Sequence, residues 1–181
     1  MAALFPIAPG AERRAERWVE TMSSMLARTG GLALLLVTVV AVLSIVGRLL
    51  IDIGLGPVPG DFEIVQAGCG FAVCAFLPLC QLRRGHVTVD ILYTGLAPGW
   101  SAWASLAGNI LMTAASALLL WRLWVGMLEK FANGETTFIL GMPVWWMYSV
   151  CTIGLTAAVL ASAYTVWRSI NAIASRQWAR A

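Results

Sequence analysis

The chain has 181 residues and a formal net charge of +3; 60% of its residues are hydrophobic and only 12% are charged. About 25% of residues are charged in an ordinary soluble domain, so the composition excludes that class. The sequence has no basic stripe with interleaved aromatic residues, which argues against nucleic acid as a partner. The length suits one compact unit, residues 1–181, and the mean hydropathy of +0.80 indicates that this unit lies in a membrane.

Residues 12–28 combine a charge cluster of mixed sign with apolar residues at helical spacing. Trp18, Met22, Met25 and Leu26 recur on one side, and Arg and Glu occupy the others. This pattern is typical of an amphipathic helix that lies along a membrane surface and leads into a span. The mixed charge, and the long apolar run beginning at Thr29, do not fit a secretory signal peptide. We therefore expect the segment to be retained as a membrane anchor.

Four apolar stretches are long enough to cross a hydrocarbon layer of about 30 Å. We predict spans at residues 29–50, 62–82, 99–124 and 143–167. Glycines and prolines between residues 54 and 60 separate the first two spans, and Pro143 suits the first turn of the fourth. A short interfacial helix is expected around residues 91–96. The predicted fold class is therefore an all-α integral membrane protein with four transmembrane helices.

Small residues recur every four positions in three spans, a spacing that lets neighbouring helices approach closely. These sets are Gly68 and Ala72; Ala104 and Gly108; and Gly154, Ala158 and Ser162. Asn109 is the predicted hydrogen-bonding residue of the third span. Pro78 removes one backbone hydrogen bond and is predicted to kink the second helix near its end.

The distribution of basic residues predicts the orientation. One side of the predicted topology has Arg13, Arg14, Arg17, Arg28, Arg83, Arg84, Arg168, Arg176 and Arg180, and the other has Arg48, Arg122 and Lys130. The positive-inside rule therefore places both termini and the link between the second and third spans in the cytoplasm. The nine tryptophans fall at predicted span ends, as expected for two interfacial aromatic belts.

Few residues of the sequence could carry chemistry. The span centres have no ionisable residue, and intramembrane charges are the usual mark of ion or proton pathways. The four cysteines have neither Cys-x-x-Cys nor metal-ligand spacing. The single histidine, His86, cannot provide bis-histidine ligation of haem within one chain, although a site shared with another chain stays open. Glu63 fits either a helix N-terminal carboxylate favoured by the macrodipole or a contact between subunits.

Three ordered motifs resemble those of a known family. Gly60-Asp61-Phe62-Glu63 opens the second span, and Arg84-Gly85-His86-Val87-Thr88-Val89-Asp90 follows it. Gly134-Glu135-Thr136-Thr137 then precedes Pro143-Val144-Trp145-Trp146-Met147-Tyr148. Over roughly residues 25–170, the order and spacing of these motifs and the four-helix topology are similar to those of the small membrane subunit of TRAP transporters (tripartite ATP-independent periplasmic transporters), the DctQ-like or Q subunit.

The resemblance implies a non-catalytic scaffold in the bacterial inner membrane. Its expected partners are the lipid bilayer, a large M subunit that carries the substrate and sodium sites, and a periplasmic substrate-binding protein that delivers an organic acid. No cofactor, metal or catalytic residue is expected in this chain. The candidate interface or family-signature residues are Glu63, Arg84, Gly85, His86, Asp90, Glu135, Thr136, Pro143, Trp145 and Tyr148. The alternative is an accessory membrane-anchor subunit of a haem- or quinone-linked oxidoreductase.

Overall fold

The computed structural model describes residues 9–83 and 98–174, and the described part is almost entirely helical. Its elements are α1 (Pro9–Leu49), the short 3₁₀ helix η1 (Ile51–Ile53), α2 (Asp61–Leu82), α4 (Pro98–Asn133) and α5 (Val144–Ala174). Four of these helices are long and apolar enough to cross a membrane. The predicted all-α class and the predicted number of spans are therefore confirmed.

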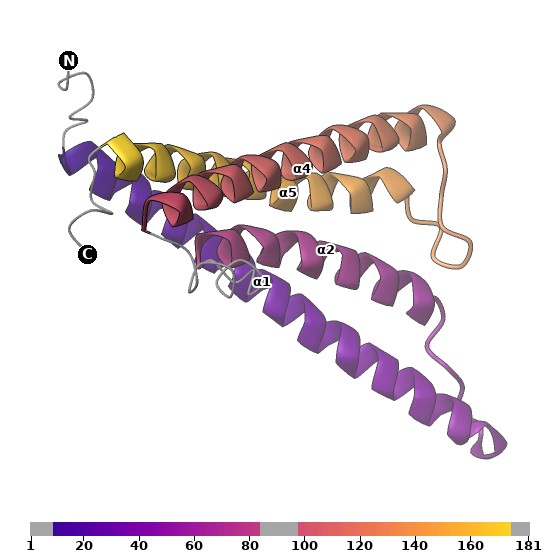
Figure 1. The fold of residues 1–181 in the computed structure, drawn as a ribbon. Helices are drawn as coiled ribbons and strands as arrows, with labels where there is room; N and C mark the ends of the chain where they lie inside the picture. Colours follow the sequence, from indigo (N-terminus) through magenta and orange to yellow (C-terminus); the bar gives the residue numbers. More distant parts are fainter. Residues whose placement is uncertain (1–8, 84–97, 175–181) are drawn as a thin grey trace.

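The four long helices form two antiparallel hairpins, α1–α2 and α4–α5. The hairpins meet along α2 and α5, so that the helices lie in the order α1, α2, α5, α4. They lie closest where α1 begins and α5 ends, and they diverge toward the opposite end (Figure 1). The end with the α1–α2 and α4–α5 connections is called the loop end below, and the opposite end the termini end.

The predicted amphipathic segment, residues 12–28, is helical but is not a separate helix. It is continuous with the first span, and Gly30 and Gly31 lie at the junction without ending the helix. Gly30 packs against Ala72 and Ala75 of α2. At 1.5 Å per residue, the 41 residues of α1 extend for about 60 Å. An ion pair between Arg168 and Glu16, 4.0 Å apart, joins α5 to this extension at the termini end. The predicted interfacial helix around residues 91–96 lies outside the described residues.

Small residues line the contacts between the helices, as predicted for two of the three sets. A side chain at Gly68 would overlap Val37 of α1, and the buried Ala72 lies against Gly30 of α1. In α5, the predicted set Gly154, Ala158 and Ser162 is buried. Within this chain the third set makes no such contact at Gly108, because a Cβ added there would meet nothing within 4 Å.

The contact between α2 and α5 is tightest at Gly154. A Cβ at this position would lie 2.9 Å from the carbonyl carbon and 3.0 Å from the carbonyl oxygen of Cys74. Pro78, which is buried within α2, has no N–H group to offer the Cys74 carbonyl four residues earlier. Gly154 of α5 therefore lies against the Cys74 carbonyl, which lacks its usual N–H donor within α2.

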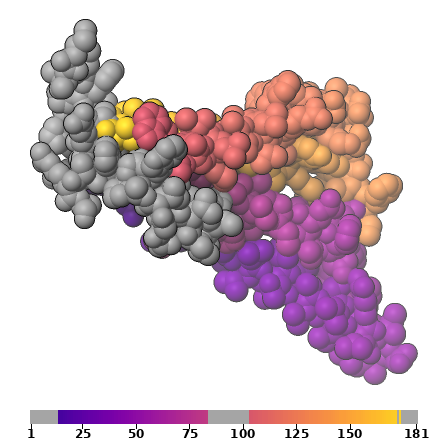
Figure 2. Space-filling model, viewed as in Figure 1, coloured from indigo at the N-terminus to yellow at the C-terminus, as the bar shows by residue number. Residues whose placement is uncertain are grey.

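Large apolar side chains cover the outside of the bundle, including Leu35 and Val39 on α1 and Leu111 and Leu118 on α4. In water such a surface would be strongly unfavourable, whereas in hydrocarbon it is the expected exterior of a helical membrane protein. Figure 2 shows the two hairpins as space-filling arms that separate toward the loop end.

Candidate functional site

The first turn of α2 lies at the centre of the loop end because it contacts both neighbouring segments. The turn begins after Gly60, whose φ of +74° falls in the left-handed region that favours glycine. A side chain at Gly60 would also collide with Leu140 of the α4–α5 loop, 2.6 Å from its Cγ. Asp61 and Glu63 follow, and each carboxylate is bound by a different part of the chain.

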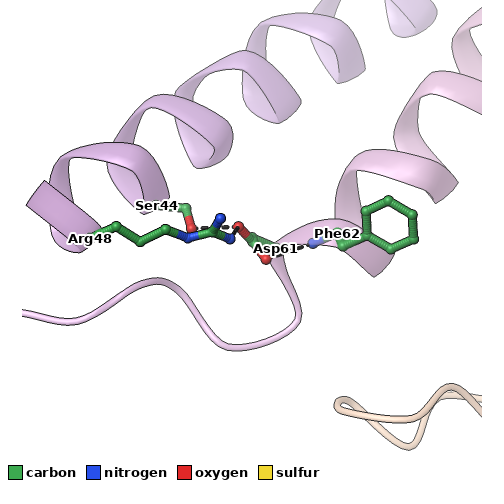
Figure 3. A network of polar contacts seen from close by, with 4 residues as sticks. All are labelled: Ser44, Arg48, Asp61 and Phe62. Carbon is green, nitrogen blue, oxygen red and sulfur yellow. Dashed lines mark hydrogen bonds and ion pairs between the residues drawn. The ribbon is translucent and has the colours of Figure 1, made fainter.

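Asp61 binds α1. Ser44 donates a hydrogen bond to Asp61 Oδ2, and Arg48 Nη2 lies 2.7 Å from the same oxygen (Figure 3). The second carboxylate oxygen accepts a hydrogen bond of 2.8 Å from the backbone N–H of Phe62. A carboxylate in the first turn of a helix is also favoured by the helix dipole. Asp61 thus closes the α1–α2 hairpin at the loop end.

Glu63 binds the α4–α5 loop, which belongs to the other hairpin. Its two carboxylate oxygens accept hydrogen bonds from the backbone N–H groups of Ile139, at 2.8 Å, and Leu140, at 3.0 Å. The residue is only 8% exposed, and such charge-assisted bonds are stronger than neutral ones. We call Glu63 and residues 137–140 the loop-end clamp.

The loop from Gly134 to Pro143 has its own internal framework. Thr137 donates its N–H to Met142 O over 2.9 Å, and Val144 donates its N–H to Glu135 O over 3.0 Å. Met142 also donates its N–H to the Thr137 hydroxyl. Together with the bridge between Thr136 and Pro143, these bonds fold the loop into a short hairpin.

Glu135 fixes the start of this loop to the end of α4. Its carboxylate lies 2.7 Å from Lys130 Nζ and accepts a second hydrogen bond from the Asn133 amide. The bond from the Lys130 ammonium, followed by that from Asn133, holds the pKa of Glu135 below its ordinary value of 4.5. The carboxylate therefore stays ionised and paired near neutral pH.

Three further predicted residues lie beside the loop. Pro143 immediately precedes α5, as predicted from its preference for helix starts. Trp145 packs edge-on against Phe131 of α4, with ring centroids 5.5 Å apart. The Tyr148 ring lies next to Gly126 of α4, 3.1 Å from where a Cβ would stand. Of the six predicted residues that the structure describes, Glu63, Glu135 and Thr136 line one cavity, and Thr136 pairs with Pro143. Trp145 and Tyr148 instead contact α4.

The other four predicted residues, Arg84, Gly85, His86 and Asp90, lie outside the described residues. Sequence reasoning did not predict the cluster of Ser44, Arg48 and Asp61. In the sequence, Asp61 is only part of a family motif, and Arg48 is only one of the basic residues that predict the orientation. The i, i+4 spacing of Ser44 and Arg48 places both on one helix face and is the sequence pattern that points to this cluster. A single sequence does not show that Asp61 faces them.

A second polar cluster lies toward the termini end of the same two central helices. Gln81 of α2 donates to Thr165 of α5 over 3.2 Å and to Asn109 of α4 over 3.5 Å. Asn109 in turn donates to the Ser169 hydroxyl over 2.8 Å. We call these four residues the termini-end network. The hydrogen-bonding role predicted for Asn109 is confirmed, and its partners are identified.

No group of three or more His, Cys, Asp or Glu residues that could hold a metal ion occurs among residues 9–83 and 98–174. A cavity of about 650 Å³ lies between the hairpins at the loop end, lined by residues that include Phe62, Glu63, Gln66 and Met147. The Glu63 carboxylate at its edge is already engaged by backbone donors.

The fold and these contacts define a four-span helical membrane protein whose polar groups hold helices and loops together. A family model described as "Tripartite ATP-independent periplasmic transporters, DctQ component" matches residues 37–172. The chain belongs to this DctQ family and is therefore the small membrane subunit of a TRAP transporter. Comparison with curated proteins and with solved structures returned no match. Family membership decides between the two predicted classes, because it assigns the chain to a transporter and not to an oxidoreductase.

Proposed function

We propose that this chain is a fixed, non-catalytic scaffold of the transporter. It binds the large M subunit within the membrane and helps to dock the periplasmic substrate-binding protein at the loop end. The M subunit then carries the substrate and coupling sodium sites, and the complex takes up an organic acid across the bacterial inner membrane. Both termini lie in the cytoplasm, as the basic residues predict.

The loop-end clamp is the observation that carries this proposal. A transport site needs a polar group free to bind its cargo, yet both Glu63 oxygens are bound by the backbone of the chain's own loop. The carboxylate instead fixes a shaped surface at one end of the bundle. Such preorganisation suits docking, because a loop held in one conformation loses little entropy when a partner binds.

The polar groups further into the spans support the same interpretation. The termini-end network consists of neutral amides and hydroxyls that bond to one another. Proton relays and ion pathways in membranes are usually marked by ionisable residues. Neutral, mutually bonded groups are typical of contacts between helices.

The test is reconstitution of the full chain with its large subunit and binding protein in proteoliposomes. Omission of this chain should abolish uptake that depends on the binding protein. Glu63→Ala should lower that uptake at unchanged expression, because the loop loses its fixed position. Glu129→Ala is the matched control, since Glu129 is an exposed glutamate on α4, which packs along α5 and not along α2. Full uptake without this chain would refute the scaffold role, and unchanged uptake in Glu63→Ala would refute docking through the clamp.

A further inference from the structure

The tip of the α4–α5 loop is apolar and exposed. Phe138 is 104% exposed and Ile139 is 63% exposed, and Leu140 and Met142 are also open to the surroundings. No charged residue occurs between Glu135 and Arg168. Exposed apolar side chains that adjoin one another on an ordered loop, as these four do, mark a surface that is normally covered.

Most backbone N–H groups of this tip are hydrogen-bonded within the protein, as an apolar environment requires. An unpaired N–H group costs several kcal/mol in hydrocarbon, so irregular segments are normally kept out of it. Here the N–H groups of Ile139 and Leu140 bind Glu63, and those of Thr137 and Met142 bind within the loop. The tip therefore presents apolar side chains while most of its polar backbone donors are occupied.

The apolar tip is also continuous with the surface that faces lipid. Phe62, in the same turn of α2 as Glu63, is 73% exposed. Trp146, in the first turn of α5, is 53% exposed, and Ile153 two turns further along is 64% exposed. Aromatic residues at helix ends are typical of the membrane–water interface. The hydrogen bonds from Ile139 and Leu140 to Glu63 fix the tip to α2 beside Phe62.

We propose that Phe138 and Ile139 insert into the interfacial layer of the lipid bilayer at the loop end and anchor the two hairpins there. Glu63 orients the anchor by binding the backbone behind it. The partner of this surface is the lipid itself, so the proposal goes beyond the scaffold function and does not depend on it. A docked binding protein would instead meet the polar first part of the same loop, Glu135 to Thr137, so that the clamp fixes one surface for lipid and another for protein.

Site-directed spin labelling tests the insertion. Phe138→Cys is labelled with a nitroxide in the full chain with its four native cysteines replaced by serine. The protein is placed in nanodiscs of phosphatidylethanolamine and phosphatidylglycerol. Leu111→Cys, at a 71% exposed position within α4, is the lipid reference. Arg17→Cys, at an exposed charged position near the start of α1, is the aqueous reference.

Insertion predicts that the label at position 138 collides with oxygen several-fold more often than with a water-soluble nickel complex, as at position 111. A preference for nickel, as at position 17, would place the tip in water and overturn the proposal. Should the cysteine-free chain not fold, benzoylphenylalanine at position 138 of the otherwise native chain, in complex with its large subunit, gives a second measurement. Irradiation should yield phospholipid adducts, whereas adducts with protein alone would assign the tip to a protein partner and overturn the lipid anchor.

Discussion

The two polar clusters of this protein hold the hairpins together by different chemistry. The loop-end clamp uses the ionised carboxylate of Glu63, and the termini-end network uses the neutral amides of Gln81 and Asn109. Glu63 and Gln81 lie on the same helix, 18 residues or about 27 Å apart. The same helix thus makes a charged contact in its first turn and a neutral contact in its last.

The positions of the two clusters explain the difference. A carboxylate in the first turn of α2 benefits from the helix dipole and from the free N–H groups of an adjacent loop. Asn109 lies eleven residues inside α4, where neighbouring side chains are the available partners. A neutral amide has a smaller desolvation cost there than a carboxylate, and it can both donate and accept. A charge is therefore used where the start of α2 meets a loop, and amides are used where Gln81, in the last turn of α2, meets the interiors of α4 and α5.

Gly154→Leu should have the largest effect because it acts on both clusters at once. Its Cβ would stand 2.9 Å from the backbone of Cys74, which cannot move aside as a flexible side chain could. The substitution should separate α2 from α5 and destabilise the fold by about 3 kcal/mol. Thermal unfolding in mild detergent measures the loss.

The matched control for this substitution is Gly108→Leu on α4, where an added Cβ meets nothing within 4 Å. Equal losses of stability in the two variants would contradict the prediction, because they would show that the close α2–α5 contact at Gly154 does not hold the two hairpins together.

Glu63→Gln should have the second-largest effect, because it disrupts the loop-end clamp and leaves the termini-end network intact. The amide keeps one acceptor oxygen but directs an NH₂ group at backbone donors that need an acceptor. The amides of Ile139 and Leu140 should exchange with deuterium about tenfold faster, whereas those of the termini-end network should be unchanged. Hydrogen–deuterium exchange with mass spectrometry measures both regions in one experiment.

Glu129→Gln on exposed α4 is the control for this experiment. Faster exchange around Asn109 as well as around Ile139 would contradict the interpretation that the two clusters are independent.

Asn109→Ala should have a smaller effect on stability, since hydrogen bonds within membranes contribute roughly 0.6–2 kcal/mol. A double-mutant cycle with Ser169→Ala isolates the bond between them, which is 2.8 Å long. The coupling free energy should fall within that range. A value near zero would show that these side chains find equivalent partners once the bond is lost.

Glu135→Gln should have the smallest effect, and it should depend on pH. The pKa of Glu135 is lowered in the folded protein by its bond to Lys130. The stability that this carboxylate contributes is therefore present above its ordinary pKa of 4.5 and is lost as the pH falls through the lower, folded value. The difference in melting temperature between the native chain and Glu135→Gln should shrink as the pH falls below about 4.5. Glu20→Gln, at an exposed position on α1 away from Lys130, should show no comparable trend.

The sequence alone was sufficient for the class of fold and for the family. Each span is long and apolar enough to be recognised locally, and the three ordered motifs carry the resemblance that the family match confirms. The roles of Asn109 and of Gly68 also followed from local pattern, because a polar residue or a small residue within a span has few alternatives.

Only the tertiary structure decided what the motif residues do. Glu63 and Leu140 are 77 positions apart, and neither residue type nor spacing indicates that one accepts a hydrogen bond from the other. Asp61 and Glu63 are two positions apart on one turn, yet they bind different hairpins. Gly108 and Gly154 look alike in sequence, but only Gly154 lies against another helix. Periodicity determines which faces of a helix are apolar or small, whereas the relative placement of the two hairpins determines which of those faces meet.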